Sequence, residues 1–183
     1  DIIILNVGRQ DRIKAQDILI QGFDQAAQAD SRLHLWIAGR EGNASAKVAA
    51  ARSAATTRDH IRLLGHRDDV SDLLCAADIF VAFSHHEGFG GALIEAMALE
   101  CPIIASDAAC FVEVLAEGDR GLLTPRGDAY ALGHAISRVA SDRELQTRLA
   151  ARGLHGYQQN YELSAVRDCM ITLYRQVSER GKL

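Results

Sequence analysis

Six short apolar stretches alternate along this 183-residue chain with segments whose apolar residues recur at helical spacing. Each stretch has the length of a strand and is nearly continuous in apolar residues, which is typical of parallel strands that are buried on both faces. Parallel strands need crossover helices, and these crossovers are right-handed. The pattern therefore predicts an α/β fold: a doubly wound, Rossmann-like domain with helices on both faces of a six-stranded parallel sheet. The six stretches are residues 2–7, 32–39, 61–64, 78–84, 102–106 and 120–124.

Helices are expected between the strands, and extra helices complete the C-terminal part of the chain. The helices between strands are expected at residues 14–29, 44–55, 69–77, 91–99 and near 110–116. In the C-terminal part, Asp128 can cap one helix, and "SDRE" at 141–144 matches a Ser-x-x-Glu capping box. Ser164 can open a last helix with an apolar face that we expect to point inward, formed by Val166, Met170, Leu173 and Val177.

The composition is that of one globular domain, which we place at residues 1–183. A net charge of −4 gives no reason to expect nucleic acid as a partner. The four cysteines form no Cys-x-x-Cys pair, which favours reduced, buried thiols in a cytoplasmic protein over disulfides or a zinc site. No apolar run reaches the roughly 18 residues of a transmembrane helix. The chain begins directly in a strand pattern without a methionine, so we expect it to be part of a longer protein.

The loops after the strands are where a doubly wound sheet binds its ligand. In the first of them, at residues 8–14, Arg9 and Lys14 stand near the start of a helix, where the helix dipole disfavours cations. They are either solvated surface charges or the cations that face a bound diphosphate, and we favour the second interpretation. Asp11 is the one obvious acidic neighbour, and we expect it to be solvated.

The stretch "EGFGGALIEAMA" at residues 87–98 combines a glycine loop with two carboxylates. The glycine loop offers backbone N–H groups at a helix N-terminus, which is an arrangement that binds anions. Glu95 has apolar neighbours on every side in the sequence, so we expect a buried carboxylate that needs a polar partner. That partner is either an arginine or solvent at a partly exposed edge, or it is the hydroxyl groups of a ligand.

A metal centre and several other kinds of active site do not match the sequence. His85 and His86 precede Glu87, but adjacent residues point in different directions and the spacing is not that of a zinc-binding His-Glu-x-x-His motif. We found no Ser–His–Asp or Cys–His arrangement, and the glycine loop lacks the Gly-Lys-Ser/Thr of a phosphate-binding Walker loop. Asp107 and Glu113 follow the next strand and could line the same cleft.

Taken together, these motifs resemble a known family. "NVGR" with Lys14, "EGFGGALIEAMA", "PIIASD" and "GLLTPRGD" occur in the order found in retaining glycosyltransferases of family four. The resemblance covers residues 2–178. This part of the chain is similar to the C-terminal, donor-binding domain of the two-domain GT-B fold. Its most specific element is the pair Glu87 and Glu95, separated by seven residues. The acceptor-binding N-terminal domain of that family has no counterpart in this sequence.

The resemblance implies a role for each candidate residue. Arg9 and Lys14 would neutralise the diphosphate of a nucleotide-sugar, Glu95 would hold the ribose, and Glu87 would lie at the transferred sugar. The nucleobase would lie against the loops around Arg40 and Leu64. The implied donor-binding residues are Gly8, Arg9, Lys14, Arg40, Leu64, Glu87, Gly88, Phe89, Gly90, Gly91 and Glu95, of which Glu87, Arg9 and Lys14 are also the catalytic candidates.

The implied reaction is transfer of a hexosyl group, with retention, from a nucleotide-diphosphate sugar to a saccharide or lipid-linked glycan. No metal or other cofactor is expected, and the acceptor would bind through the absent domain, so the fragment alone is expected to be inactive. The full protein would be cytoplasmic, either free or peripheral at the inner membrane face. The alternatives are a nucleotide-sugar epimerase or sugar phosphorylase of related architecture, or a nucleotide-binding module without chemistry. Four departures from the family stand out: Ala15, Phe83, Glu100 and residues 107–110.

Overall fold

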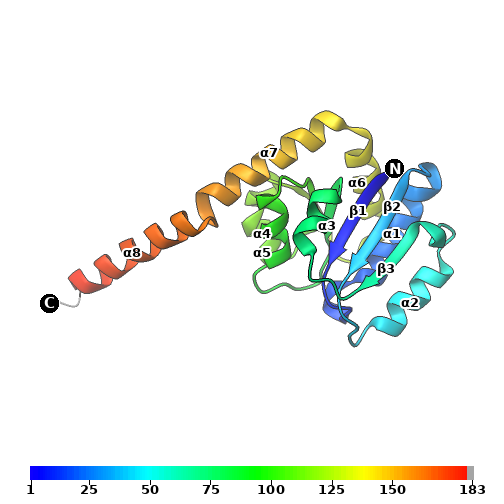
Figure 1. Cartoon of the computed structure of the whole chain (residues 1–183), viewed down its shortest axis with the longest axis horizontal. Coiled ribbons are helices and arrows are strands. Elements are labelled where there is room, and N and C mark those ends of the chain that lie inside the picture. The colour runs from blue at the N-terminus through cyan, green and yellow to red at the C-terminus, as the bar shows by residue number, and fades with distance from the viewer. Residues whose placement is uncertain (181–183) are drawn as a thin grey trace.

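The computed structural model describes residues 1–180 and confirms the predicted α/β fold. Six parallel strands form one sheet in the order β3-β2-β1-β4-β5-β6 (Figure 1). This is the strand order of a dinucleotide-binding Rossmann domain. The strands are β1 (Ile2–Val7), β2 (Leu33–Ala38), β3 (Ile61–Gly65), β4 (Ile79–Ala82), β5 (Ile103–Ser106) and β6 (Leu122–Thr124).

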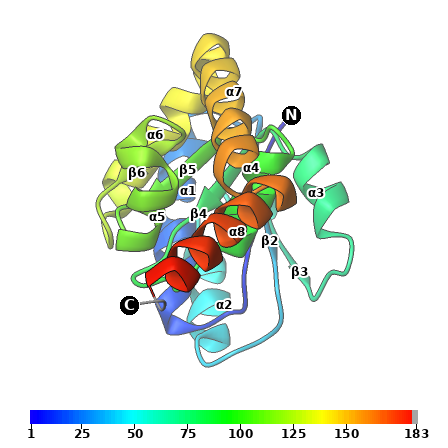
Figure 2. The same ribbon diagram turned by 90° about the vertical axis from the view of Figure 1, so that its left-hand side faces the viewer.

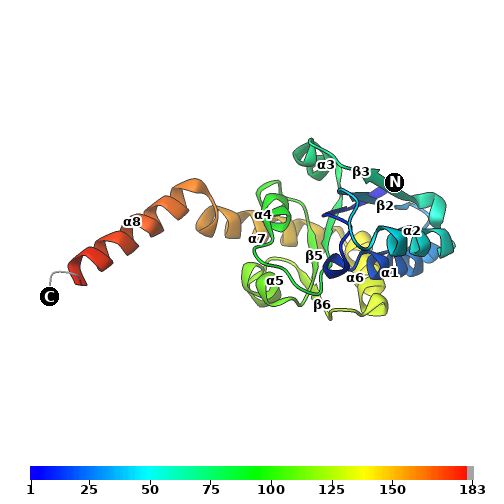
Figure 3. The ribbon, with the colours of Figure 1, turned by 90° about the horizontal axis from the view of Figure 1, so that it is seen from below.

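Helices cover both faces of the sheet, as the continuous apolar strands require. Neighbouring residues along a strand point to opposite faces, so Ile4 packs into one core cluster and Leu5 into the other. On one face lie α1 (Gln16–Ala29), α2 (Ser45–Ala54) and α6 (Ala129–Ser141). On the other face lie α3 (Val70–Ala76), α4 (Gly91–Ala98) and α5 (Ala109–Val114), so that α1 and α3 stand on opposite sides of the strands (Figure 3).

Two long helices, α7 (Arg143–Asn160) and α8 (Leu163–Arg180), complete the described chain. Helix α7 packs against α4, whereas α8 continues outward and projects away from the sheet (Figures 1 and 2). The inward-facing interpretation of α8 is therefore wrong, because the apolar side chains of its expected inner face are exposed in the described structure. The exposed side chains on that face are Val166, Met170, Leu173 and Val177, with exposed fractions of 38% to 61%.

The ends of the helices agree with the predicted bounds to within about two residues, which is the usual uncertainty, with one change of capping residue. Asp128 caps α6 as expected, by accepting a hydrogen bond from the Ala131 N–H. The capping box with Ser141 as its first residue is wrong. Ser141 is the last residue of α6, and Asp142, whose backbone is extended, accepts the hydrogen bond from the Leu145 N–H instead.

The cysteines are all free, but only Cys101 is buried, so the expectation of four buried thiols is wrong. Cys75 and Cys169 are exposed, and Cys110 is half-buried. Within residues 1–180 no group of three or more potential metal ligands comes together. None of the helices in that range has both the length and the apolar character that a membrane crossing requires.

Candidate active site

The predicted site loops meet at the switch point of the sheet, between β1 and β4. The chain runs outward from this point in both directions, so the crossovers after β1 and β4 go to opposite faces and leave a crevice between their loops. The loop after β1 carries Lys14, and the loop after β4 carries Glu87. Both loops end where a helix begins, α1 in one case and α4 in the other.

Lys14 and Glu87 form a salt bridge across this crevice. Their side chains are largely shielded, with exposed fractions of 25% and 18%. The expectation that Lys14 has no acidic partner other than Asp11 is therefore wrong: the two candidate residues are each other's partners. Together with Gly90, Gly91 and residues beneath them, they line a cavity of about 60 Å³.

The glycine loop enters α4 through a left-handed turn at Gly90. Gly90 is buried, with φ of +76°, a conformation that side-chain-bearing residues rarely adopt. A Cβ at this position would lie 3.2 Å from the Phe111 ring. The Gly90 carbonyl accepts hydrogen bonds from the Leu93 and Ile94 N–H groups, which starts α4 and turns its N-terminus towards the cavity.

A buried polar network forms the floor of the cavity, and sequence reasoning missed it. Asn6, at the end of β1, donates to the Val81 carbonyl at 2.8 Å and accepts from the Gln16 side-chain amide at 2.9 Å. The same amide also donates to the Gly8 carbonyl, at 3.0 Å. The Gln16 Oε1 atom is buried without a hydrogen-bond partner among the described residues. The asparagine within the apolar run "IIILNV" was the available signal, because a polar residue inside a buried strand needs partners.

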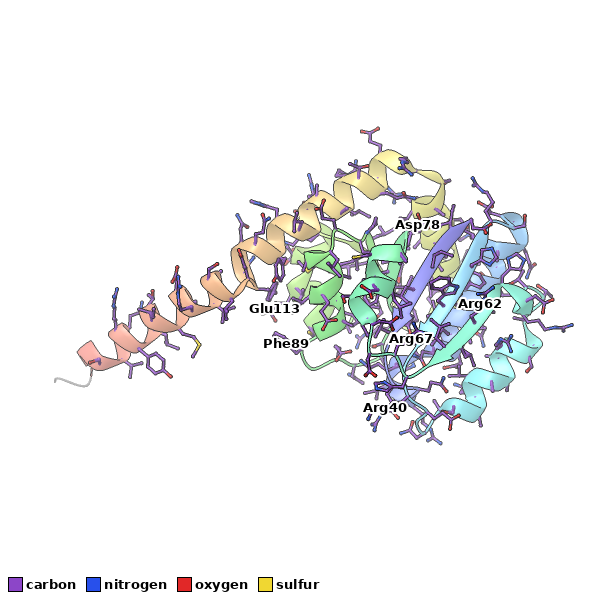
Figure 4. All side chains as sticks on the ribbon, viewed as in Figure 1. Arg40, Arg62, Arg67, Asp78, Phe89 and Glu113 are labelled. Carbon is purple, nitrogen blue, oxygen red and sulfur yellow. The ribbon has the colours of Figure 1, made fainter. Side chains whose placement is uncertain are left out.

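A second pocket lies on the other side of β1, where the ends of β1, β2 and β3 meet. It has a volume of about 260 Å³ and is walled by Val7, Ala38 and Val70. Three arginines line it, and Figure 4 shows Arg40 and Arg67 close together at this end of the strands. Arg9 is the third, and its guanidinium pairs with Asp11. Arg67, which pairs with Asp69, was missed from the sequence.

Tight backbone packing connects these strand ends. A Cβ at Gly39 would lie 2.0 Å from the Gly8 carbonyl oxygen, so no other residue fits there. The Gly8 N–H donates to the Ala38 carbonyl at 2.9 Å, and the Gly39 N–H donates to the Gly65 carbonyl at 2.7 Å. Arg40 therefore leaves the sheet at a fixed place, and its guanidinium reaches the His66 ring at 3.0 Å.

Two candidate residues lie differently from the expectation. Glu95 is exposed, because α4 buries only the face formed by Leu93, Ile94, Ala96 and Met97. The premise that Glu95 is a buried carboxylate is therefore wrong, and it lines neither pocket. Leu64 is half-buried against the core on the α3 and α4 face, and it does not line the arginine pocket.

The remaining members of the glycine loop, Gly88 and Phe89, are exposed, and 66% of the Phe89 surface is accessible. Figure 4 shows Phe89 on the loop that runs below the helices of this face in that view. Asp107 pairs with Arg126, another residue that sequence reasoning did not select, and Glu113 lies on α5.

The electrostatics of the site argue against a thiol nucleophile. Burial acts to raise the pKa of the Asp11 carboxyl. Hydrogen bonds from the Asn43 backbone and from Arg9 outweigh this effect and keep the pKa below its usual value. Burial raises the pKa of the nearby Cys110 thiol, and the charges of Glu87 and Glu113 raise it further. Cys110 is therefore a protonated thiol at neutral pH, which is a poor nucleophile.

Comparison with known proteins establishes the class of protein that this fold and site define. The family model described as "Glycosyl transferases group 1" matches residues 1–142. The chain belongs to this glycosyltransferase family.

Two curated relatives illustrate the match. The chain is 30% identical over 187 residues to a phosphatidyl-myo-inositol mannosyltransferase of Mycobacterium leprae, an alignment covering 97% of this chain and 47% of the relative. It is 28% identical over 156 residues to the lipopolysaccharide core biosynthesis glycosyltransferase LpsE of Rhizobium meliloti, covering 84% and 46%. The chain thus spans about half the length of these relatives.

Solved structures show the same fold. HepE of Anabaena, in complex with UDP and glucose, superposes with a TM-score of 0.80 at 23% identity, covering 100% of this chain and 48% of HepE. The C-terminal domain of a glycosyl transferase group 1 family protein from Francisella tularensis superposes with a TM-score of 0.79 at 20% identity, covering 88% of this chain and 87% of that domain.

Proposed function

We propose that this chain is the donor-binding half of a retaining glycosyltransferase that transfers a hexosyl group from a nucleotide-diphosphate sugar. The observation that carries the proposal is the meeting of Lys14 and Glu87 at the switch point, beside the N-terminus of α4. A cation, a carboxylate and a helix N-terminus around one cavity suit a ligand that carries both an anionic diphosphate and a polyhydroxyl sugar.

The diphosphate would lie between Lys14, Arg9 and the N–H groups at the start of α4. The Lys14 ammonium would then exchange part of its contact with Glu87 for contact with phosphate oxygens, which leaves Glu87 to accept hydrogen bonds from the sugar. The nucleobase would lie in the arginine pocket beside Arg40. Glu95, on the exposed face of α4, would reach the ribose hydroxyls from solvent.

Charge development in the reaction explains why these groups suit it. The acceptor oxygen bonds to the anomeric carbon while the bond from that carbon to the diphosphate oxygen breaks, and the acceptor proton passes to the departing phosphate. Negative charge builds on the diphosphate, where Lys14, Arg9 and the helix N-terminus stabilise it. Glu87 would orient the sugar and stabilise the positive charge at the anomeric carbon. We propose that this set of protein cations makes a metal ion unnecessary.

The names of similar proteins suggest a nucleobase and an acceptor to propose for this chain. HepE is described in complex with UDP and glucose, so UDP-glucose is the first donor to test. Relatives are named for lipopolysaccharide and phosphatidylinositol glycosylation, so we propose a saccharide or lipid-linked acceptor. We further propose a cytoplasmic protein, free or peripheral at the membrane, in which acceptor binding and sugar transfer need a region outside this chain.

Isothermal titration tests the donor site directly. We expect UDP, GDP or ADP to bind the chain at least tenfold more tightly than the matching nucleoside, and equally well with magnesium or with excess chelator. The chain alone should transfer no glucose from UDP-glucose to added saccharides. Binding of nucleoside and nucleoside diphosphate with equal affinity would exclude the diphosphate site. Binding that requires magnesium would exclude a metal-independent one, and transfer by the chain alone would show that no further region is needed.

A further inference from the structure

The salt bridge between Lys14 and Glu87 depends on two loops that are joined at a single backbone unit, His85. The His85 N–H donates a hydrogen bond to the Ile13 carbonyl at 2.7 Å. Ile13 immediately precedes Lys14, and His85 lies two residues before Glu87. The backbone of His85 therefore helps to hold the two candidate residues near each other.

The carbonyl of the same residue is held from a third loop. Arg126, between β6 and α6, donates from Nη1 to the His85 carbonyl at 3.3 Å. Its guanidinium is itself oriented by Asp107, which accepts from the Arg126 Nε at 3.0 Å and from the Arg126 backbone N–H at 2.9 Å. The Asp107 N–H in turn donates to the Thr124 carbonyl at 2.8 Å, which connects this loop to the end of β6.

Stability alone does not account for this arrangement. The side chains of Arg126 and Asp107 are 44% and 46% exposed, and an exposed ion pair of this kind contributes little to the stability of the fold. The planar guanidinium fork, by contrast, can satisfy a carboxylate and a carbonyl at the same time, which a lysine ammonium on a flexible stem does poorly. The geometry of Arg126 suits a residue that orients the His85 backbone.

We propose that Arg126 is a positioning residue: it bridges Asp107 and the His85 carbonyl and thereby keeps Glu87 opposite Lys14. In this role Arg126 acts through the 84–90 loop, whose His85 carbonyl it contacts. The ligand-binding consequence rests on the proposed function, whereas the effect on the loop does not.

The first arm of the test needs no ligand. Amide hydrogen exchange is measured for the peptide covering residues 84–90 in the wild type, Arg126→Ala and Arg32→Ala. Arg32 is the matched control, because it is an exposed arginine that pairs with Asp30 at the opposite edge of the sheet. We expect Arg126→Ala to speed exchange of this peptide by about three- to tenfold, since local opening sets the exchange rate. The strands and the melting temperature should be unchanged. Equal exchange in all three proteins would overturn the proposal.

The second arm uses UDP and separates positioning from direct charge. Arg126→Ala should weaken UDP binding about five- to tenfold, because a loosened 84–90 loop no longer holds the Gly90 and Gly91 N–H groups at the cavity. Arg126→Lys should not restore the affinity. Asp107→Ala should match Arg126→Ala, and the double variant should be no weaker than either one, because both residues act through one connection. Full rescue by Arg126→Lys would overturn the proposal by showing that the charge itself binds the ligand. If the wild type binds no nucleoside diphosphate, the proposed function fails, and the exchange measurement still decides the role of Arg126.

Discussion

Polar side chains differ between the carboxyl edge of the sheet, where the parallel strands end, and the amino edge, where the strands begin. At the carboxyl edge, polar side chains are buried at the ends of the strands, in the loop after β1 or in the first turn of α1. One of them, Gln16, buries an oxygen that lacks a partner among the described residues. The buried polar side chains of residues 1–178 all lie at this edge: Asn6, Gln10, Gln16, Asp17, Ser84, Ser106 and Thr124.

At the amino edge, polar side chains are more exposed and are satisfied locally. Asp78 accepts a hydrogen bond from the Ile3 N–H at 2.7 Å, and Figure 4 shows it at the end of the sheet away from Arg40. Asp24, near the end of α1, accepts from the backbone and side chains of Thr56 and Thr57. These contacts close the turns that lead into the strands.

The difference between the two edges suggests that one contributes mainly to ligand binding and the other mainly to the stability of the fold. Burying polar groups is costly unless they are hydrogen-bonded. Most buried polar groups at the carboxyl edge have such bonds, and the Gln16 Oε1 atom is buried there without a partner among the described residues. Substitutions of the exposed or half-buried candidate residues at the carboxyl edge should change ligand affinity with little effect on folding, and substitutions at the amino edge should do the reverse.

The largest effect is expected at Lys14. Lys14→Ala removes a charged hydrogen bond to the diphosphate, so UDP affinity should fall by about 1.5–3 kcal/mol, roughly ten- to a hundredfold. Binding of uridine should barely change. Titration of both ligands measures this, with Arg32→Ala as the control that should keep wild-type affinity. An equal loss for UDP and uridine would mean that Lys14 acts on the fold of the site and not on the diphosphate.

Asp24 offers the opposite case at the amino edge. Asp24→Ala leaves the Thr56 and Thr57 N–H groups without their acceptor, which should lower the free energy of unfolding by about 1–2 kcal/mol. UDP affinity should stay the same. Chemical denaturation measures the first quantity, with Asp59→Ala as the control at an exposed carboxylate nearby. A change in UDP affinity without a change in stability would remove the distinction between the two edges.

The pH dependence of stability provides a second test of Asp24. Burial opposes the shift, but hydrogen bonds from Thr57 and Thr56 outweigh it and hold the pKa of Asp24 below its usual 3.8. A carboxyl whose folded pKa is depressed stabilises the protein above its unfolded pKa, and this contribution is lost as the pH falls. The gap in stability between wild type and Asp24→Ala should therefore narrow below about pH 4. If the difference in stability does not change with pH, the loss in Asp24→Ala comes from packing and not from the charge of the carboxylate.

Much of the architecture could be predicted because it depends on local patterns. The continuous apolar strands gave the parallel sheet, and the rule for doubly wound sheets gave the loops that matter. What the sequence could not show was pairing across loops: Lys14 with Glu87, and Arg126 with Asp107, are brought together by the strand order. The exposure of Glu95 was missed because a short helix on a sheet buries only one face.

Two of the four departures from the family coincide with unusual backbone angles. Ala15 and Glu100 stand where the family usually has glycine, and their φ angles are +44° and +55°. This left-handed region favours glycine. Ala15 connects Lys14 to the start of α1, so the chain holds a strained residue beside its candidate site.

Glu95 tests how far the carboxyl edge extends. If its exposed carboxylate accepts hydrogen bonds from the ribose, Glu95→Gln should weaken UDP binding about tenfold, at the low end for a hydrogen bond to a charged acceptor. Binding of the 2′,3′-dideoxy analogue should not change. Glu100→Gln is the matched control, because Glu100 is an exposed glutamate just after the other end of α4. Equal weakening of both ligands, or none of either, would leave Glu95 outside the binding site.

The smallest effect, and the one with the least obvious sign, is expected at Glu87. In the ligand-free chain its carboxylate holds the Lys14 ammonium, so it competes with a diphosphate for the same cation and repels its charge. Glu87→Gln keeps a hydrogen-bond acceptor but removes the charge, so UDP should bind about threefold more tightly, on the order of 0.7 kcal/mol. UDP-glucose should not gain, because the sugar would lose the carboxylate that orients it. Glu113→Gln, a carboxylate on α5, is the control and should leave both affinities unchanged. If Glu87→Gln weakens UDP instead, the salt bridge serves to place Lys14 for the diphosphate, and the two residues act as one unit of the carboxyl edge.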